Sequence, residues 1–461
     1  MTAPESLRGA RQSVVIATMD AKRQAATDIV TRLRAERFQA YLAGGCVRDL
    51  VMGREPTDYD IATDATPEQV VKLYPDALTV GAQFGVVIVP NETGNIEVAT
   101  FRSDGRYDDG RHPVEVRFSR TPQEDVRRRD FTINGLLLDP ATDDVLDYVG
   151  GRADIAARRL RTIGDPVARF RENRLRMLRA VRFAARFDFA LDVAALKAIQ
   201  DYAPQIRDVS AERVRDELIK ILTEGRARRG FELLDETGLL KEILPEIKAL
   251  QGVEQPPEFH PEGDVWIHTL LMLEGLRNPT PTLALGVLLH DVGKPPTFSI
   301  KERIRFDHHV EVGARMAEEI CARLRLSTRE VERAVELVRH HLRFKDLPRM
   351  KRSTQMRFLR LEGFEEHLEL HRLDCLSSHR DLSNYDLAKR LLEETPPEVI
   401  KPEPLIRGED LIAQGYTPGP AFKEILRAVE DAQLEGKLHD REGALRLVAE
   451  LFPQTPPQIK S

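Results

Sequence analysis

Two short motifs in the first part of the chain decide its fold. They read Gly44-Gly45-Cys46-Val47-Arg48-Asp49 and Asp58-Tyr59-Asp60-Ile61-Ala62-Thr63. Two glycines between a predicted strand and a predicted helix let backbone amides approach a phosphate closely, with the helix N-terminus facing it. Arg48, one turn into that helix, could then pair with a triphosphate. The first motif therefore predicts a phosphate-binding turn.

The second motif predicts a metal site. Asp58 and Asp60 are two residues apart on a predicted strand, so their side chains point to the same face. Paired carboxylates suit two Mg²⁺ ions, because hard cations take oxygen ligands. Such a pair of ions can activate a 3′-hydroxyl and stabilise the departing pyrophosphate. The alternative is a glycine-rich turn followed by an aspartate-rich loop with no catalytic role.

Working outward from these motifs, the pattern indicates one mixed α/β domain followed by helical regions. Short runs rich in Val, Ile, Thr and Phe predict strands at 41–43, 59–62, 86–89, 96–101 and 114–118, with helices at 47–52 and 67–73. After residue 150 the strand signals nearly vanish and amphipathic helices follow. Proline-rich segments near 255–261 and 396–404 suggest linkers. We therefore expect domains at 25–150, 151–250, 251–395 and 396–461.

Composition excludes several classes of protein. The 461 residues are 41% hydrophobic and 31% charged, which is typical of a globular chain and not of a disordered one. Three widely spaced cysteines argue against a disulfide framework and favour a reducing cytoplasm. The longest apolar run, 282–289, is far shorter than the roughly 20 residues that span a bilayer, so no membrane partner is expected. No protein partner can be read from the sequence.

Charge and histidine are both distributed unevenly. The chain carries a net charge of −6, but residues 151–230 contain 19 Lys and Arg against 11 Asp and Glu, a net of +8. A basic block in an acidic chain is the footprint expected of a polyanion-binding surface. Ten of the twelve histidines lie between His260 and His379. The two asymmetries separate a basic middle region from a histidine-rich region.

Three further blocks follow the opening motifs in order: residues 96–102 (IEVATFR), 124–134 (EDVRRRDFTIN) and 174–187 (RLRMLRAVRFAARF). With the opening motifs, they resemble the class II tRNA nucleotidyltransferases and bacterial poly(A) polymerases of the polymerase-β-like superfamily, over about residues 38–250. The resemblance implies an α+β chain. Its polymerase-β-like nucleotidyltransferase head would have a mixed sheet, followed by all-α neck, HD and tail domains.

The resemblance also implies roles for individual residues. Asp58 and Asp60 would bind Mg²⁺, and Glu97 is a candidate third catalytic carboxylate, although it could be an ordinary exposed strand residue. Residues 127–129 could likewise be a solvated basic run. The arginines of 174–187 fall mostly on one helical face, and those matching Arg179 and Arg182 contact the nucleotide in the family. The nucleotide-binding set is Gly44, Gly45, Arg48, Arg129, Asp130, Asn134, Asn173, Arg176, Arg179 and Arg182.

The family reads the incoming base with a Glu-Asp-x-x-Arg block, and this chain departs from it. Here the block is Glu172-Asn173-Arg174-Leu175-Arg176. A carboxylate accepts from the exocyclic amino group of cytosine or adenine, and the arginine supplies a donor to the ring nitrogen. An asparagine carbonyl can also accept, but its amide group could donate to a keto oxygen. We therefore expect softer base discrimination, unless another residue tightens it.

The histidine-rich region resembles an HD phosphohydrolase domain. Its expected metal ligands, in chain order, are His268, His290, Asp291, His309, His341 and Asp374. Mixed imidazole and carboxylate ligands suit a divalent transition metal or Mg²⁺, which could polarise a phosphoester. Neighbouring His308 and His340 leave open which member of each pair binds. The alternative is that these histidines are satisfied core residues.

The resemblance to the tRNA nucleotidyltransferases implies an enzyme that adds CCA to tRNA 3′ ends from CTP and ATP without a nucleic-acid template, with Mg²⁺ and release of pyrophosphate. Its partners would be tRNA and the two nucleotides. The rivals are a poly(A) polymerase, a partial CC-adding or A-adding enzyme and, more remotely, an HD phosphohydrolase whose front domain merely binds RNA. The loop from Ser103 to Pro113 is expected to help switch between bases. The final module, 407–435, could touch the tRNA body or serve packing alone.

Overall fold

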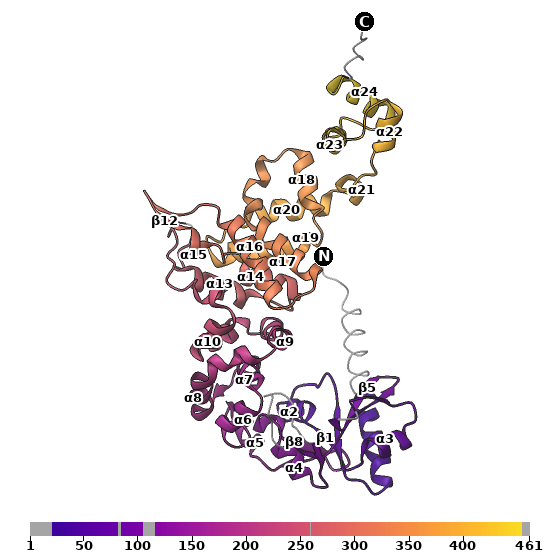
Figure 1. The fold of residues 1–461 in the computed structure, drawn as a ribbon, viewed down its shortest axis with the longest axis vertical. Coiled ribbons are helices and arrows are strands. Elements are labelled where there is room, and N and C mark those ends of the chain that lie inside the picture. The colour runs from indigo at the N-terminus through magenta and orange to yellow at the C-terminus, as the bar shows by residue number, and fades with distance from the viewer. Residues whose placement is uncertain (1–20, 82–83, 105–115, 259, 454–461) are drawn as a thin grey trace. The chain divides into compact units, whose positions relative to one another are not determined.

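The computed structural model describes residues 21–81, 84–104, 116–258 and 260–453. The chain forms two compact units, a first that ends at Lys248 and a second that begins at Ala249 (Figure 1). Among the described residues, no helix is both long and apolar enough to cross a lipid bilayer.

The first unit is built on a mixed sheet of seven strands in the order β3-β4-β5-β2-β1-β8-β9. Strands β2 and β5 run parallel, and the other neighbouring pairs are antiparallel. The strands are β1 (Ala40–Ala43), β2 (Asp60–Thr63), β3 (Leu78–Gly81), β4 (Val86–Asn91), β5 (Gly94–Thr100), β8 (Leu136–Asp139) and β9 (Asp144–Asp147). A separate pair, β6 (Arg102–Asp104) and β7 (Val116–Phe118), flanks residues outside the described part.

Both faces of the central strands are buried. Leu42 and Ile61, paired across β1 and β2, pack on one face with Val98, whereas Ala43 and Ala62 pack on the other. The head helices are α2 (Gly45–Val51), α3 (Pro67–Leu73), α4 (Pro122–Arg127) and α5 (Gly151–Ala156), and residues 21–35 are also helical. The strands and helices predicted for the head overlap observed elements, although residues 114 and 115 of the last predicted strand lie outside the described residues. β3, β6, β8 and β9 were not predicted. β8 is an apolar run without alternation, which periodicity cannot assign.

The rest of the first unit is helical, apart from the short parallel pair β10 (Arg159–Leu160) and β11 (Ala190–Leu191). Helix α7 packs against α9 and α10. The helices are α6 (Pro166–Glu172), α7 (Leu175–Phe187), α8 (Val193–Tyr202), η3 (Ala203–Asp208), α9 (Ala211–Thr223), α10 (Ala227–Glu236), α11 (Leu239–Ile243) and α12 (Pro245–Lys248).

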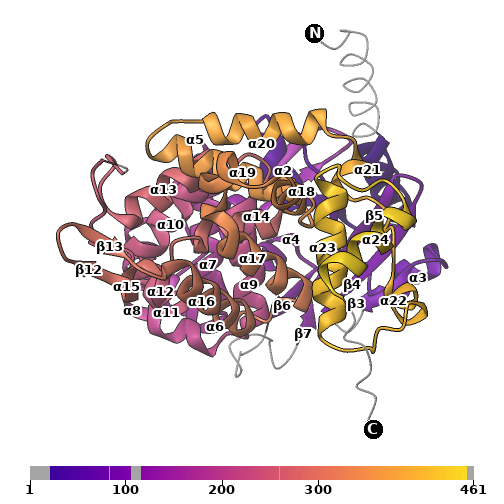
Figure 2. The same cartoon turned by 90° about the horizontal axis from the view of Figure 1, so that it is seen from above.

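The second unit is a helical bundle with one short antiparallel hairpin and a C-terminal module. Its larger part contains α13 (Val265–Gly275), α14 (Pro281–Leu289), α15 (Lys294–Thr297), the hairpin β12 (Phe298–Ile300) and β13 (Ile304–Phe306), α16 (His309–Arg323), α17 (Thr328–His340), η4 (His341–Arg349), α18 (Arg352–Leu359), α19 (Phe364–Ser377), α20 (Ser383–Glu394) and α21 (Pro397–Ile400). Helices α22 (Gly408–Ala413), α23 (Ala421–Leu434) and α24 (Arg441–Leu451) gather around their own small core (Figure 2).

Candidate active site

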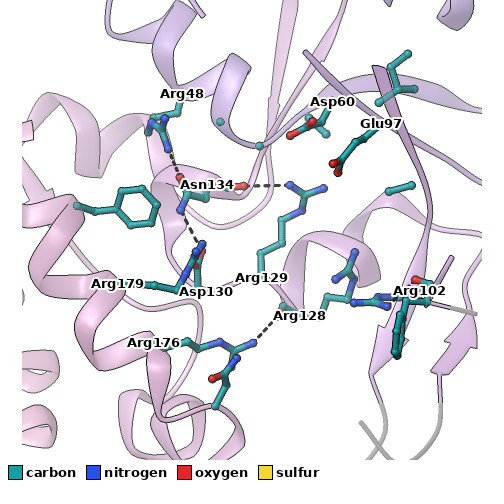
Figure 3. Close-up of a pocket in the computed structure, with 18 residues that line it drawn as sticks. Arg48, Asp60, Glu97, Arg102, Arg128, Arg129, Asp130, Asn134, Arg176 and Arg179 are labelled. Carbon is teal, nitrogen blue, oxygen red and sulfur yellow. Dashed lines mark hydrogen bonds and ion pairs between the residues drawn. The ribbon is translucent and has the colours of Figure 1, made fainter. Parts of the chain in front are cut away.

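Two acidic side chains are brought together by the parallel pairing of β2 and β5. Asp60 opens β2 and is the register partner of Glu97 in β5, so the two carboxylates lie beside each other on one face (Figure 3). Burial, and then the charge of Glu97, raise the pKa of Asp60 to about 6. Neighbouring carboxylates repel each other unless a cation lies between them. This pair therefore fits a hard divalent cation.

Asp58 does not share that face in this structure, contrary to the expectation from the Asp-x-Asp spacing. β2 begins only at Asp60, so the alternation of a strand does not extend to residue 58. The Asp58 side chain is 78% exposed, and its carboxylate lies 3.5 Å from the Lys22 ammonium. It lines a separate cavity of about 180 Å³ with Tyr59 and Thr93. Its charge nevertheless contributes to the raised pKa of Asp60, so the two carboxylates are within electrostatic reach of each other.

The cavity beside Asp60 and Glu97 has a volume of about 630 Å³, which suits a nucleotide-sized ligand. Its charged lining is mostly basic, so it favours a polyanion. The predicted residues that line it are Gly44, Gly45, Arg48, Asp60, Glu97, Arg129, Asp130, Asn134, Asn173, Arg176 and Arg179. Sequence reasoning did not assign Phe84, Arg102, Arg128 and Phe183, which also line it. Arg102, Arg128 and Phe183 lie in the blocks quoted above, whereas Phe84 does not.

The glycine turn makes room for an arginine. Gly44 has φ of 75°, and a Cβ atom there would lie 2.7 Å from Nη1 of Arg129. Arg129 in turn pairs with the buried carboxylate of Asp125 at 3.0 Å. Its charge also acts on Asp60, whose pKa it lowers against the larger effect of burial. The Gly-Gly motif thus lets a guanidinium group approach the backbone beside the acidic pair.

A chain of hydrogen bonds links the floor of the cavity to α7. Arg48 donates to Oδ1 of Asn134 at 2.7 Å, Asn134 donates to Asp130 at 3.0 Å, and Arg179 donates to Asp130 at 2.8 Å (Figure 3). Burial alone would raise the pKa of Asp130, but Arg179 and Asn134 outweigh it and lower the pKa to about 2. Arg48 is itself buried, with its guanidinium over the Phe187 ring. These side chains are held by one another before any ligand arrives.

Arg182 lies outside this cavity, although it was expected to contact the nucleotide. Its Nε donates to Glu217 at 2.6 Å, and its Nη1 donates to Glu224 at 3.2 Å. Arg186 of the same stripe also pairs with Glu224. The arginine face of α7 is therefore partly neutralised by Glu217 and Glu224. The local charge sum counted both carboxylates but could not show that they pair with this face.

Asn173 and Arg176, which were predicted to read the base, line the cavity near the start of α7. Asn173 follows α6, and its Oδ1 accepts from the backbone amide of Leu175 at 3.1 Å and from Arg213 at 3.3 Å. Arg176 donates to Glu172 at 2.6 Å and to the Arg128 carbonyl at 3.1 Å. The Asn173 carbonyl oxygen is thus already engaged inside the protein.

In the second unit, three buried or nearly buried histidines present the same nitrogen to one centre. Nδ1 of His290 lies 2.8 Å from the Val287 carbonyl, and Nδ1 of His309 lies 2.8 Å from that of Phe306. Nδ1 of His341 lies 2.7 Å from the Val338 carbonyl. These bonds place the proton on Nδ1. Within the described residues, Nε2 of each ring is buried with no hydrogen-bond partner. Orphaned Nε2 lone pairs of this kind fit a metal ion.

The expected ligands form two adjacent groups, His268 with His290 and Asp374, and Asp291 with His309 and His341. They meet at Asp291, whose Oδ2 lies 3.0 Å from Nε2 of His290 and whose Oδ1 lies 3.9 Å from Nε2 of His341. All six expected ligands therefore converge.

The structure also separates the neighbouring histidines that the sequence left unresolved. The side chain of His308 is 84% exposed, whereas His309 joins the cluster. The ring of His340 lies 5.9 Å from that of His367, away from the group that contains His341.

Three family models match successive parts of the chain. Residues 40–161 match the poly A polymerase head domain, residues 188–251 a probable RNA and SrmB-binding site of polymerase A, and residues 265–380 the HD domain. A CCA-adding enzyme of Enterococcus faecalis is 30% identical over 421 residues, which cover 91% of this chain and 94% of that protein. This chain belongs to the CCA-adding enzyme family.

Two further relatives define how far the likeness extends. A CCA-adding enzyme of Geobacillus thermodenitrificans is 43% identical over 216 residues, 47% of this chain and 53% of that protein, so the match spans about half of its length. The crystal structure of the Bacillus stearothermophilus CCA-adding enzyme in complex with CTP has a TM-score of 0.73 and 27% identity, covering 93% of this chain and 97% of that one. The predicted fold class is confirmed.

Proposed function

We propose that this chain adds CCA to the 3′ ends of tRNA from CTP and ATP, without a nucleic-acid template. The observation that carries the proposal is the register pairing of Asp60 with Glu97 beside an arginine-lined cavity of about 630 Å³. A solved relative with the same fold was crystallised with CTP. Together they support a site that holds a nucleoside triphosphate against paired carboxylates.

The chain's residues divide the work. In the reaction, the tRNA 3′-hydroxyl attacks the α-phosphate of CTP or ATP, and pyrophosphate leaves. Asp60 and Glu97 would hold the metal ion through their carboxylate oxygens. Asp58 joins them once its side chain turns from Lys22. Mg²⁺, when bound, supplies neutralisation of the developing phosphate charge. Arg129 and Arg179 contact the phosphates.

Base selection falls to Asn173 and Arg176, which line the same cavity. RNA recognition, mainly by shape and backbone, falls to the residues after 150. The domains at 25–150, 151–250, 251–395 and 396–461 and a cytoplasmic location remain predictions. The segment 105–115, in the predicted base-switching loop, lies outside the described residues.

The decisive experiment supplies the protein with three RNAs and labelled CTP or ATP in the presence of Mg²⁺. The RNAs are tRNA that ends before CCA, tRNA that ends in CC, and an unstructured RNA. Ordered addition of C, C and A to the first RNA is the expected result. A long A tail on the unstructured RNA indicates a poly(A) polymerase, and additions that stop short indicate a partial enzyme. No incorporation on any RNA contradicts the proposal, and Asp60→Asn is the negative control.

We infer a second function for the second unit, metal-dependent hydrolysis of phosphoesters. The observation in its favour is the set of buried Nε2 atoms without partners among the described residues. Mixed imidazole and carboxylate ligands fit a divalent transition metal or Mg²⁺, which supplies polarisation of the phosphoester when bound. Candidate substrates are 2′,3′-cyclic phosphates on RNA ends and nucleotide phosphates. Hydrolysis of a 2′,3′-cyclic nucleotide with Mn²⁺, lost in His290→Ala and kept in Asp60→Asn, is expected. The absence of hydrolysis in the wild type contradicts this function.

A further inference from the structure

A buried carboxylate that no sequence motif singled out adjoins the histidine cluster. Glu262 lies in the loop before α13, and its side chain is 6% exposed. Its Oε1 lies 2.7 Å from Nδ1 of His268 and 2.9 Å from Nδ1 of His260. Its Oε2 is buried and has no hydrogen-bond partner among the described residues. Oε1 of Glu262 thus contacts two histidines, and Oε2 has no partner among the described residues.

We propose that Glu262 is a positioning residue of the metal centre, acting through His268. By accepting a hydrogen bond from Nδ1–H, it fixes the ring so that Nε2 faces the cluster, where it would bind the ion. This inference rests on the second proposed function. Metal-binding histidines commonly donate their other N–H to a carboxylate or carbonyl, which orients the ring and raises its basicity.

His268 differs from the other histidines of the cluster in the charge of its partner. His290, His309 and His341 lie against backbone carbonyls, whereas His268 lies against a carboxylate. A carboxylate is the stronger acceptor, because charge-assisted hydrogen bonds are shorter and stronger than neutral ones. Glu262 also adds a negative charge to those of Asp291 and Asp374, and this favours a divalent cation.

A purely structural role as an anchor for the loop is already filled by another residue. Asp264 accepts from the backbone amide of Gly252 at 2.7 Å and from that of Ile267 at 2.8 Å, so it ties the loop to the start of α13. Glu262 bonds to side chains of the cluster instead. The two acids, two residues apart, therefore provide a matched pair of variants that separates ligand orientation from loop stability.

The test measures Co²⁺ binding by calorimetry to the full chain, stripped of metal with a chelator. All proteins carry Asp60→Asn and Glu97→Gln, so that the first unit contributes no site. Glu262→Ala should weaken Co²⁺ binding by about 10- to 100-fold and shift the visible absorption of bound Co²⁺. Glu262→Gln keeps an acceptor and should lose less. Asp264→Ala should lower the thermal midpoint and leave the Kd of the folded protein unchanged.

Two outcomes overturn different statements. If the parent protein binds no Co²⁺, the metal centre itself fails, and the role of Glu262 fails with it. If the parent binds and Glu262→Ala binds with the same Kd and spectrum, only the role of Glu262 fails. Circular dichroism tests whether each variant is folded. If Glu262→Ala does not fold, the Kd and spectrum of Glu262→Gln are compared with those of the parent instead.

Discussion

Glu217 of α9 accepts a hydrogen bond from Nε of Arg182 in α7 at 2.6 Å, and both side chains are buried. The pair neutralises an arginine that the sequence assigned to ligand binding. It also joins α9, which lies in the region that matches the probable RNA and SrmB-binding site of polymerase A, to α7, which borders the arginine-lined cavity.

Removing one member of this pair should destabilise the first unit. Glu217→Ala leaves Arg182 buried with a weaker partner, and breaking a buried ion pair costs about 3 kcal/mol. The double variant Glu217→Leu with Arg182→Met should lose less, because no charge remains unpaired. Denaturant unfolding followed by circular dichroism measures both, and fluorescence of Trp266, the only tryptophan and a residue of the second unit, monitors the other unit. Equal losses in the two variants contradict this account.

Asp60→Asn should strongly slow nucleotide addition without weakening the fold. Loss of a metal-binding carboxylate is expected to lower kcat by at least about 100-fold, as removal of other charge-stabilising groups does. Because Asp60 and Glu97 repel each other in the metal-free protein, the substitution should leave the thermal midpoint unchanged or slightly higher. Glu97→Gln provides the companion measurement. A marked fall in the midpoint of Asp60→Asn would show that the residue has a structural role instead.

Asn173→Asp should sharpen base selection. The Asn173 carbonyl oxygen is engaged by Leu175 and Arg213, which leaves its amide group able to donate to a keto oxygen. A carboxylate can only accept, so the variant should raise the ratio of CTP to UTP incorporation by about tenfold. Single-turnover incorporation with each nucleotide measures the ratio. Identical ratios of CTP to UTP incorporation for wild type and variant would contradict this prediction.

Acid should weaken the first unit through Asp130. Its pKa is about 2 in the folded protein, below the ordinary value of 3.8, so its contribution is complete above about pH 4 and is lost as pH falls towards 2. A shift of this size corresponds to about 2 kcal/mol. Asp130→Asn should therefore be less stable at pH 7 by about that amount, and the difference should shrink between pH 4 and 2. A difference that is independent of pH contradicts the assignment.

Much of the fold could be predicted from local sequence, because strand alternation and helical periodicity are short-range properties. The strands at β1, β2, β4 and β5 were predicted, whereas β8 was missed because a strand buried on both faces lacks alternation. In the candidate site, all six HD residues converge as the resemblance to HD domains implies, although they come from elements far apart in the chain. Asp58 differs because strand pairing begins only at Asp60, and pairing is not a local property.

The sequence by itself determined which residue types are available: paired carboxylates, an arginine stripe, and histidines in order. Only the tertiary structure decided how they are used. The register of β2 on β5 sets Glu97 beside Asp60, the packing of α9 on α7 neutralises Arg182 with Glu217, and a loop brings Glu262 to His268. The physical reason is that electrostatic interactions depend on distance and burial between residues far apart in the chain. The sequence specifies the charge of each residue, but the fold determines which residue it interacts with.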